Sequence, residues 1–214
     1  MIYDTYIFDL DGTLLDTIGD LTATANYALR LYGMPERTKN EIRSFMGNGV
    51  RRMLMQAVPD GADNPRFEDV LDAFNQYYKE HSLDTTRPFD GIPETLAALK
   101  ARGCRLAVVS NKSKDATQAL CRHFFSDTIE VSVGENDAEG IRKKPAPDLV
   151  NAALRQLGVG KENAVCVGDT EVDIMTAHNA GLPSISVLWG FRDLDFLKQH
   201  GAKNYVSAPQ DLLL

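Results

Sequence analysis

The pattern of apolar and polar positions changes twice along the chain. Residues 3–10 form a short apolar run rich in Ile, Phe, Tyr and Leu, which predicts a buried strand. From residue 16 to about residue 82 the convincing apolar patterns have helical spacing, and none alternates as in a strand. After residue 88, apolar runs and helical patterns alternate. We therefore expect one strand, then a helical segment, then a succession of strands and helices.

The alternating part of the chain predicts a parallel sheet. Strands are expected at residues 105–110, 129–133, 164–168 and 184–188, and helices at 92–102, 147–157 and 174–180. Because parallel strands need helical crossovers, helices cover both faces of such a sheet. We expect an α/β fold with a Rossmann-like, three-layer core. The last stretch, residues 193–214, predicts only a short helix and a weak strand at 204–206.

The helical segment interrupts this core. About 95 residues separate the first two predicted strands, whereas a simple crossover unit takes about thirty residues in all. The excess predicts an all-helical cap domain, residues 16–88, inserted after the first strand. The core domain is then formed by residues 1–15 and 89–214. The cap helices are expected from Asp16 or Thr17 to about residue 32, at 38–45, around 50–55 and at 67–78.

Composition is that of an ordinary globular protein. The chain has 214 residues, of which 43% are hydrophobic and 25% charged, and its net charge is −7. Such an acidic chain lacks the basic footprint of a general nucleic-acid-binding protein. No apolar run approaches the ~20 residues that span a bilayer, and the N-terminus lacks the pattern of a secretion signal. We expect no nucleic-acid partner, no membrane partner and a cytoplasmic location.

The cysteines and histidines give no sign of a metal site. Cys104, Cys121 and Cys166 are odd in number, widely spaced and set mostly among apolar neighbours. This pattern is typical of reduced cysteines in a core and not of a disulfide framework. The four histidines lack the spacing of metal ligands.

Two aspartates, Asp9 and Asp11, stand at the end of the first predicted strand. Carboxylates at a buried strand end repel each other and lose hydration, so they need a cation or a hydrogen-bond network. Gly12 and Thr13 follow, and a turn there offers backbone N–H groups to an anionic oxygen. Metal-assisted phosphate chemistry is one interpretation. The other is an Asx-turn with a helix cap, because Asp-Gly-Thr is common in turns.

Polar residues also follow the other predicted strands. The second strand is followed by Ser110-Asn111-Lys112, the region after the third holds Lys143-Lys144-Pro145, and the fourth is followed by residues 168–173. In an open parallel sheet, ligands bind at the carboxyl ends of the strands. We therefore expect these side chains to meet Asp9 and Asp11 at one edge of the sheet.

The residues expected at this edge suit phosphoryl transfer. Asp9, Asp11 and Asp169 offer hard oxygen ligands of the kind that Mg²⁺ prefers. One carboxylate can attack phosphorus, and a second can donate a proton to the departing alkoxide. Ser110, Asn111 and a lysine can stabilise the phosphoryl oxygens.

These motifs resemble those of the haloacid-dehalogenase superfamily of phosphohydrolases. Asp9-Leu10-Asp11-Gly12-Thr13 is similar to the first motif of that family, Ser110-Asn111 to the second, Lys144-Pro145 to the third, and Gly168-Asp169 with Asp173 to the fourth. The resemblance covers essentially the whole chain, and the helical insertion lies where the family has its cap. Four motifs in this order are highly specific, whereas the first alone is only suggestive.

The resemblance implies a role for each catalytic residue. Asp9 is expected to be the nucleophile and Asp11 the general acid and base. A carboxylate at position 11 favours a phosphatase over a dehalogenase. Lys144 is expected to neutralise the phosphorylated aspartate, and Asp173 to orient Lys144 or a water on the metal.

The resemblance also implies Mg²⁺ as the cofactor. The expected metal ligands are Asp9, Asp169 and the backbone carbonyl of Asp11. The groups expected to bind phosphate are Gly12, Thr13, Ser110, Asn111 and Lys144.

Substrate choice is expected to come from the cap. Residues 45–51 and 187–191 resemble segments of the phosphoglycolate phosphatases within this family. Glycines there let the backbone approach a small ligand, and an amide or guanidinium can bind a carboxylate. The alternative is a flexible helix break with solvated basic residues. The cap residues expected to contact substrate are Gly47, Asn48, Gly49 and Arg51.

These expectations combine into a Mg²⁺-dependent phosphatase for a small phosphate monoester, with 2-phosphoglycolate as the leading substrate. The protein is expected to work as a monomer or homodimer. One alternative is a pyrophosphatase, or a broad sugar-phosphate phosphatase or phosphomutase, on the same fold. An alternative of another class is a catalytically silent protein that binds phosphate ligands.

Overall fold

The computed structural model describes residues 3–136 and 140–214, and the chain forms two compact units. The core unit comprises Met1–Leu15 and Pro88–Leu214, and the helical unit comprises Asp16–Arg87. The chain leaves the core unit at β2 (Leu15–Asp16) and returns at β3 (Arg87–Pro88). These two short strands pair with each other, so the two connections run side by side.

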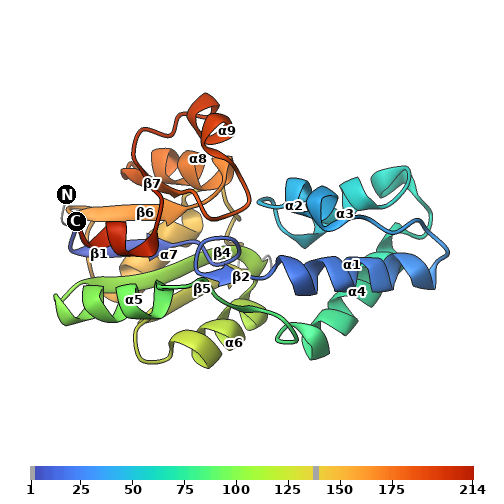
Figure 1. The fold of residues 1–214 in the computed structure, drawn as a ribbon, viewed down its shortest axis with the longest axis horizontal. Helices are drawn as coiled ribbons and strands as arrows, with labels where there is room; N and C mark the ends of the chain where they lie inside the picture. Colours follow the sequence, from blue (N-terminus) through green and yellow to red (C-terminus); the bar gives the residue numbers. More distant parts are fainter. Residues whose placement is uncertain (1–2, 137–139) are drawn as a thin grey trace. The chain divides into compact units, whose positions relative to one another are not determined.

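The core unit is built on a six-stranded parallel sheet (Figure 1). The strands lie in the order β5-β4-β1-β6-β7-β8, and every neighbouring pair is parallel. This arrangement confirms the predicted α/β fold, with the first strand of the chain between β4 and β6. The strands are β1 (Thr5–Phe8), β4 (Arg105–Ser113), β5 (Val131–Glu135), β6 (Ala164–Gly168), β7 (Ser184–Val187) and β8 (Tyr205–Val206).

Alternate residues of β1 pack on opposite faces of the sheet. Tyr6 and Phe8 belong to the apolar cluster with α5 and α6, while Ile7 belongs to the cluster with α7 and α8. Because both faces are covered, the central strands β1 and β6 are buried at every position, whereas β5 and β7, nearer the edges of the sheet, alternate apolar residues with serine. The bounds of the covering helices are α5 (Ile92–Ala101), α6 (Lys114–Phe125), α7 (Asp148–Leu157) and α8 (Glu171–Ala180).

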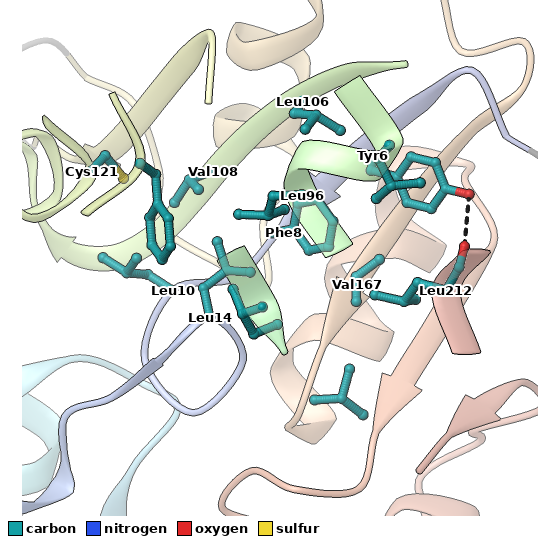
Figure 2. Close-up of a cluster of buried hydrophobic side chains, with 14 of the residues drawn as sticks. Tyr6, Phe8, Leu10, Leu14, Leu96, Leu106, Val108, Cys121, Val167 and Leu212 are labelled. Carbon is teal, nitrogen blue, oxygen red and sulfur yellow. Dashed lines mark hydrogen bonds between the residues drawn. The ribbon is translucent and has the colours of Figure 1, made fainter. Parts of the chain in front are cut away.

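The C-terminal segment completes the first of these clusters. Figure 2 shows Tyr6 and Phe8 there, with the Tyr6 hydroxyl donating a hydrogen bond of 3.4 Å to the carbonyl of Leu212. Arg102 donates from Nη1 to the carbonyl of Leu213 at 2.6 Å. The segment therefore adds an edge strand and a closing turn to the core. Its elements are α9 (Leu194–Gln199), β8 and the 3-10 helix η3 (Pro209–Leu213).

The helical unit is held together by packing between its first and last helices and by one buried carboxylate. The Tyr27 and Tyr77 rings stack with centroids 3.9 Å apart. Asp20 is buried and accepts hydrogen bonds of 2.9 Å from the backbone N–H groups of Thr85 and Thr86. The elements of this unit are α1 (Ile18–Leu31), α2 (Lys39–Phe45), α3 (Val50–Ala57), the 3-10 helix η1 (Gly61–Asp63) and α4 (Phe67–His81).

Some elements differ from the sequence-based expectation. Helix α6 has no predicted counterpart, because its buried face includes Thr117 and Cys121 and so gives a weak apolar stripe. Strand β4 extends to Ser113 instead of ending at residue 110, and β5 begins at Val131 instead of residue 129. Helix α8 begins at Glu171 instead of residue 174, after a polar turn that carries no apolar signal.

The cysteines at 104, 121 and 166 are buried and free, as the sequence predicts. Within the described ranges, no helix combines the length and the apolar character needed to cross a bilayer.

Candidate active site

The carboxyl ends of three adjacent strands bring the predicted motifs together. Asp9 directly follows β1, Ser110 and Asn111 lie near the end of β4, and Asp169 directly follows β6. Because β4, β1 and β6 are parallel neighbours, their carboxyl ends share one edge of the sheet. All four side chains are buried there.

Lys144 connects this edge to helix α8. Its buried ammonium donates to Asp9 Oδ1 at 2.6 Å and to Asp173 Oδ1 at 2.7 Å. Asn111 fixes the Lys144 backbone: its Oδ1 accepts from the Lys144 N–H at 2.7 Å, and its Nδ2 donates to the Lys144 carbonyl at 3.0 Å. The amide of the second motif therefore holds the lysine of the third.

Asp169 occupies a tight space beside two glycines. Its Oδ1 accepts from Thr13 Oγ1 at 3.0 Å, and its Oδ2 accepts from the backbone N–H of Phe191 at 2.7 Å. A Cβ on Gly12 would lie 2.4 Å from Asp169 Oδ2, and one on Gly190 would lie 2.2 Å from Asp169 Cβ. Gly12 also has φ +86°, so it is needed both for the turn and for the space.

Asp173 uses both oxygens of its carboxylate. Oδ1 accepts from Lys144, while Oδ2 accepts from the Thr170 N–H at 3.0 Å and from Thr170 Oγ1 at 2.8 Å. The second set of bonds caps the N-terminus of α8 and fixes the side chain. Asp173 can therefore hold Lys144 in one orientation.

Three buried carboxylates crowd this edge: oxygens of Asp9, Asp169 and Asp173 all lie within 4.8 Å of one another. Burial raises the pKa of Asp9 to about 7. The charge of Lys144 acts to lower this pKa, and the charge of Asp173 acts to raise it. Burial, followed by the charges of Asp9 and Asp173, raises the pKa of Asp169 well above its usual range. Burial disfavours the charged Lys144, but Asp173 and Asp9 outweigh it and raise the pKa of that ammonium.

This donor set fits a hard divalent cation. One ammonium group cannot neutralise three buried carboxylates, and carboxylate oxygens are the ligands that Mg²⁺ prefers. The cluster contains Asp9 and Asp169, which the sequence assigns to the metal, and adds Asp173. The Asp11 side chain is directed elsewhere, to Lys112. Ligation by the Asp11 backbone carbonyl stays a prediction.

Lys112 has no role in the sequence-based assignment, although it directly follows the second motif, near the end of β4. Its Nζ is 3.1 Å from Asp11 Oδ1, and the two side chains are 4% and 12% exposed. The pair is close, but the ammonium is not aligned for a hydrogen bond to that oxygen. The available signal is a lysine at the end of an apolar strand, because lysine is almost never buried unless it is paired.

The turn after Asp11 uses the backbone N–H groups that the sequence offers to an anionic oxygen, and binding of phosphate by Gly12 and Thr13 stays a prediction. The Gly12 N–H donates to the Leu15 carbonyl at 2.9 Å, and the Thr13 N–H donates to the Leu10 carbonyl at 3.4 Å. These two N–H groups therefore serve the turn, while the Thr13 hydroxyl serves Asp169. Trp189 Nε1 donates to the Thr13 carbonyl at 2.9 Å, which fits packing against the first motif.

Several residues join the site without a sequence-based role. Ser110 Oγ accepts from the Lys112 N–H at 3.2 Å, so the serine positions that lysine as well. Thr170, Gly190 and Phe191 enclose Asp173 and Asp169. Thr170 has only its position after β6 as a signal in the sequence, whereas Gly190 and Phe191 follow β7 in the segment 187–191 that resembles phosphoglycolate phosphatases.

The residues predicted to contact substrate in the cap lie in the helical unit, at the start of α3. Gly47 and Gly49 have φ +115° and +82°, values that favour glycine, and Asn48 between them is half-buried. Arg51 donates to both carboxylate oxygens of Glu68. Two of the five N–H donors of Arg51 are therefore already bound to a carboxylate.

Comparison with known proteins agrees with the motifs. The family described as haloacid dehalogenase-like hydrolase matches residues 6–187. A phosphoglycolate phosphatase of Aquifex aeolicus is 35% identical over 191 residues, which cover 88% of this chain and 86% of that protein. An N-acetylmuramic acid 6-phosphate phosphatase of Pseudomonas aeruginosa is 32% identical over 209 residues, which cover 97% and 92%.

A solved structure has nearly the same fold over its whole length. This crystal structure, from Lactobacillus delbrueckii subsp. bulgaricus, carries a provisional name as a phosphoglycolate phosphatase. It superimposes with a TM-score of 0.93 at 36% identity and covers 99% of this chain and 97% of that one.

Proposed function

Because this chain belongs to the haloacid dehalogenase-like hydrolase family and is a phosphatase, we propose that it transfers the phosphoryl group of a small phosphate ester to Asp9 and then to water. The observation that carries this proposal is the buried Lys144, bonded to both Asp9 and Asp173. A nucleophilic carboxylate needs a fixed orientation and a nearby positive charge for the phosphoryl oxygens.

The first step forms a bond between Asp9 and phosphorus. Because Lys144 donates a hydrogen bond to Oδ1 of Asp9, we assign the attack on phosphorus to Oδ2 of Asp9. The bond between phosphorus and the ester oxygen breaks as the new bond forms. Asp11 donates a proton to the departing oxygen, which leaves as an alcohol.

The second step restores the enzyme. Asp11, now ionised, accepts a proton from the attacking water, and the oxygen of that water forms a bond to phosphorus. The bond between phosphorus and Asp9 breaks, inorganic phosphate leaves, and Asp9 returns to its carboxylate form. Lys144 stays paired with Asp173 throughout and stabilises the negative charge of the phosphorylated aspartate.

Mg²⁺ is the proposed cofactor. Asp9, Asp169 and the Asp11 backbone carbonyl would hold it, in accord with the crowded carboxylates and the raised pKa of Asp169. When bound, the cation supplies positive charge for the phosphoryl oxygens. The groups proposed to bind phosphate are Gly12, Thr13, Ser110, Asn111 and Lys144.

We propose 2-phosphoglycolate as the substrate and the helical unit as the cap that selects it. The name of the Aquifex relative supports this choice. The proposed contacts in this unit are Gly47, Asn48, Gly49 and Arg51. A sugar-phosphate phosphatase is the second candidate, favoured by the name of the Pseudomonas relative. The protein is proposed to work in the cytoplasm, as a monomer or homodimer.

Phosphate release from a panel of esters tests this function. The panel is 2-phosphoglycolate, glycerol phosphate, N-acetylmuramic acid 6-phosphate and pyrophosphate, each at saturating Mg²⁺. We expect 2-phosphoglycolate to have the highest kcat/KM and Asp9→Asn to abolish turnover. Equal rates for wild type and Asp9→Asn would sink the assignment of the nucleophile. If no phosphate in the panel is turned over, the alternative of a catalytically silent protein that binds phosphate ligands is favoured over this proposal.

A further inference from the structure

The segment of residues 189–192 lies between β7 and α9 and contains none of the residues of the four motifs. We propose that Arg192 is a positioning residue for the divalent cation. Its ion pair with Glu171 holds this segment in place, and the segment in turn holds Asp169 in the orientation that binds Mg²⁺. This inference rests on the proposed role of Asp169 as a metal ligand.

The 189–192 segment contacts both the first and the fourth motif. Trp189 Nε1 donates to the Thr13 carbonyl at 2.9 Å, and the Phe191 N–H donates to Asp169 Oδ2 at 2.7 Å. Between them, Gly190 packs so closely that a Cβ there would lie 2.2 Å from Asp169 Cβ. The position of this segment therefore helps to set the position of the Asp169 carboxylate.

The bond from Phe191 to Asp169 comes from a backbone N–H, which only the path of the chain can place. Thr13 Oγ1 donates to the other oxygen of that carboxylate, Oδ1, at 3.0 Å. Because the two bonds act on different oxygens, together they fix the plane of the carboxylate. Mutation of such hydrogen-bond partners of a metal ligand typically costs about 10- to 100-fold in metal affinity.

Arg192 anchors the segment next to that N–H. Its Nε donates to Glu171 Oε2 at 3.1 Å, and its Nη2 donates to Oε1 at 3.5 Å. The two side chains are 13% and 18% exposed, so water and salt screen this pair less than an exposed one. A planar guanidinium bound to both oxygens of one carboxylate also fixes direction. Glu171 begins α8, two residues after Asp169, so the pair ties the segment to the helix that follows the metal ligand.

The sign of the expected effect separates positioning from charge alone. Arg192 is a cation next to the residue that bonds Asp169, so its field opposes the binding of Mg²⁺ there. Removal of that charge by itself would therefore strengthen the binding of the cation. If Arg192 acts by positioning Asp169, the same removal weakens binding, because the freed segment no longer holds the carboxylate in place. A purely structural role would lower the thermal midpoint equally with and without Mg²⁺.

The test is a titration of the protein with Mg²⁺ alone, followed by its thermal midpoint. We expect Arg192→Gln to raise the half-saturating Mg²⁺ concentration about 10-fold. Arg192→Lys keeps the charge but lacks the planar fork, so it should have a smaller effect in the same direction. The matched control is Arg105→Gln. Arg105 also donates to both carboxylate oxygens of its partner, Glu130, but it lies at the amino end of β4, away from the site, and should leave the half-saturating concentration unchanged.

An unchanged or lower half-saturating concentration in Arg192→Gln overturns the inference. If that variant does not fold, the result for Arg192→Lys decides in the same way. The response of the wild type keeps this inference distinct from the proposed function. If the wild-type midpoint does not respond to Mg²⁺, the proposed cofactor is wrong and the inference falls with it. If the wild type responds and Asp169→Asn does not, the proposed ligand is supported, and a normal response of Arg192→Gln overturns this inference alone.

Discussion

Lys144 and Asp173 are joined by a hydrogen bond of 2.7 Å between Nζ and Oδ1, in a cluster with more carboxylates than ammonium groups. Asp173→Asn keeps the shape of the side chain and removes one negative charge. We expect kcat to fall about 10- to 100-fold, because Lys144 loses the anion that orients it. Stability should stay level or rise as like-charge repulsion is relieved. Steady-state kinetics and thermal unfolding measure the two effects.

The matched control for that variant is Asp148→Asn. Asp148 also lies in the first turn of a helix, but its partner is the exposed Arg142. The Asp148→Asn variant should leave kcat unchanged. A normal kcat in Asp173→Asn would contradict the orienting role of Asp173.

Asp11→Asn separates proton donation from nucleophilic attack. An alkyl ester needs a proton on its leaving oxygen, whereas the p-nitrophenolate of an aryl ester leaves without one. We expect kcat for 2-phosphoglycolate to fall about 10²- to 10⁴-fold and kcat for p-nitrophenyl phosphate to fall much less. An equal loss on both esters would argue against Asp11 as the acid.

Gly190→Ala tests the tight space around Asp169. The added Cβ would lie 2.2 Å from Asp169 Cβ and 2.5 Å from the Gly12 carbonyl oxygen. We expect a loss of about 1–3 kcal/mol in the free energy of unfolding, and a loss of activity as Asp169 is displaced. Urea unfolding and phosphate release measure the two.

Gly158→Ala is the control for Gly190→Ala. Gly158 ends α7 with φ +71° and has no heavy atom within 4 Å of the added Cβ. It should cost about 1 kcal/mol of stability through backbone strain alone, with full activity. If Gly190→Ala is as active as Gly158→Ala, the hypothesis that Asp169 has no room for a Cβ at residue 190 is wrong.

Mg²⁺ should raise the thermal midpoint of the protein. Binding to the native state alone stabilises it by about 2.7 kcal/mol at a hundred times Kd, and chelation removes that gain. We expect Asp169→Asn to abolish the shift, and Asp148→Asn, outside the carboxylate cluster, to keep it. The comparison of midpoints with Mg²⁺ and with a chelator checks this without reference to activity. An unchanged shift in Asp169→Asn would count against Asp169 as a ligand.

Asp20 should make the stability of the helical unit depend on pH. Burial acts to raise the pKa of Asp20, but hydrogen bonds from Thr85 and Thr86 outweigh it and lower that pKa. A carboxylate with a lowered folded pKa stabilises the fold above its unfolded pKa of about 4, and this contribution is lost as the pH falls through the folded value. Asp20→Asn should therefore lose about 1–3 kcal/mol at pH 7 and progressively less below about pH 4.

Urea unfolding at pH 7 and at pH 3 measures this dependence. Asp72→Asn, on an exposed position of α4, is the control and should change stability little at either pH. A constant difference between Asp20→Asn and wild type across this range would show that the ionised carboxylate is not what stabilises the fold.

The elements that the sequence predicts well carry strong local signals. Strand β6 has the predicted bounds because an apolar run ends there at Gly168, and α7 ends at Leu157 because Gly158 follows. Helix α6 escapes prediction because its contacts with the sheet, rather than a local apolar stripe, decide its conformation. The meeting of the loops follows from parallel topology alone, without knowledge of side chains.

The hydrogen-bond and ion-pair partners within the site are less predictable, because they depend on the backbone conformation of loops that are far apart in the sequence. The bond from the Phe191 N–H to Asp169 joins residues in different loops and uses no side chain of Phe191. The contact of Lys112 with Asp11 joins the end of β4 to the residues that follow β1. The ion pair of Arg51 with Glu68, 17 residues away on another helix, also has no local signal in the sequence, and contact of Arg51 with substrate stays a prediction.

The central place of β1 has a consequence for the growing protein. Asp9 is synthesised early. The hydrogen bond from Thr13 to Asp169 joins residues 156 positions apart in the chain, and the bond from the Phe191 N–H to Asp169 forms only after residue 191 has been made. Closing such long loops costs entropy before any of these bonds can form. A fragment cut before Phe191 therefore contains Asp9, the proposed nucleophile, but lacks the N–H that holds Asp169. The complete set of contacts around Asp169 therefore forms only after almost the whole chain has been made.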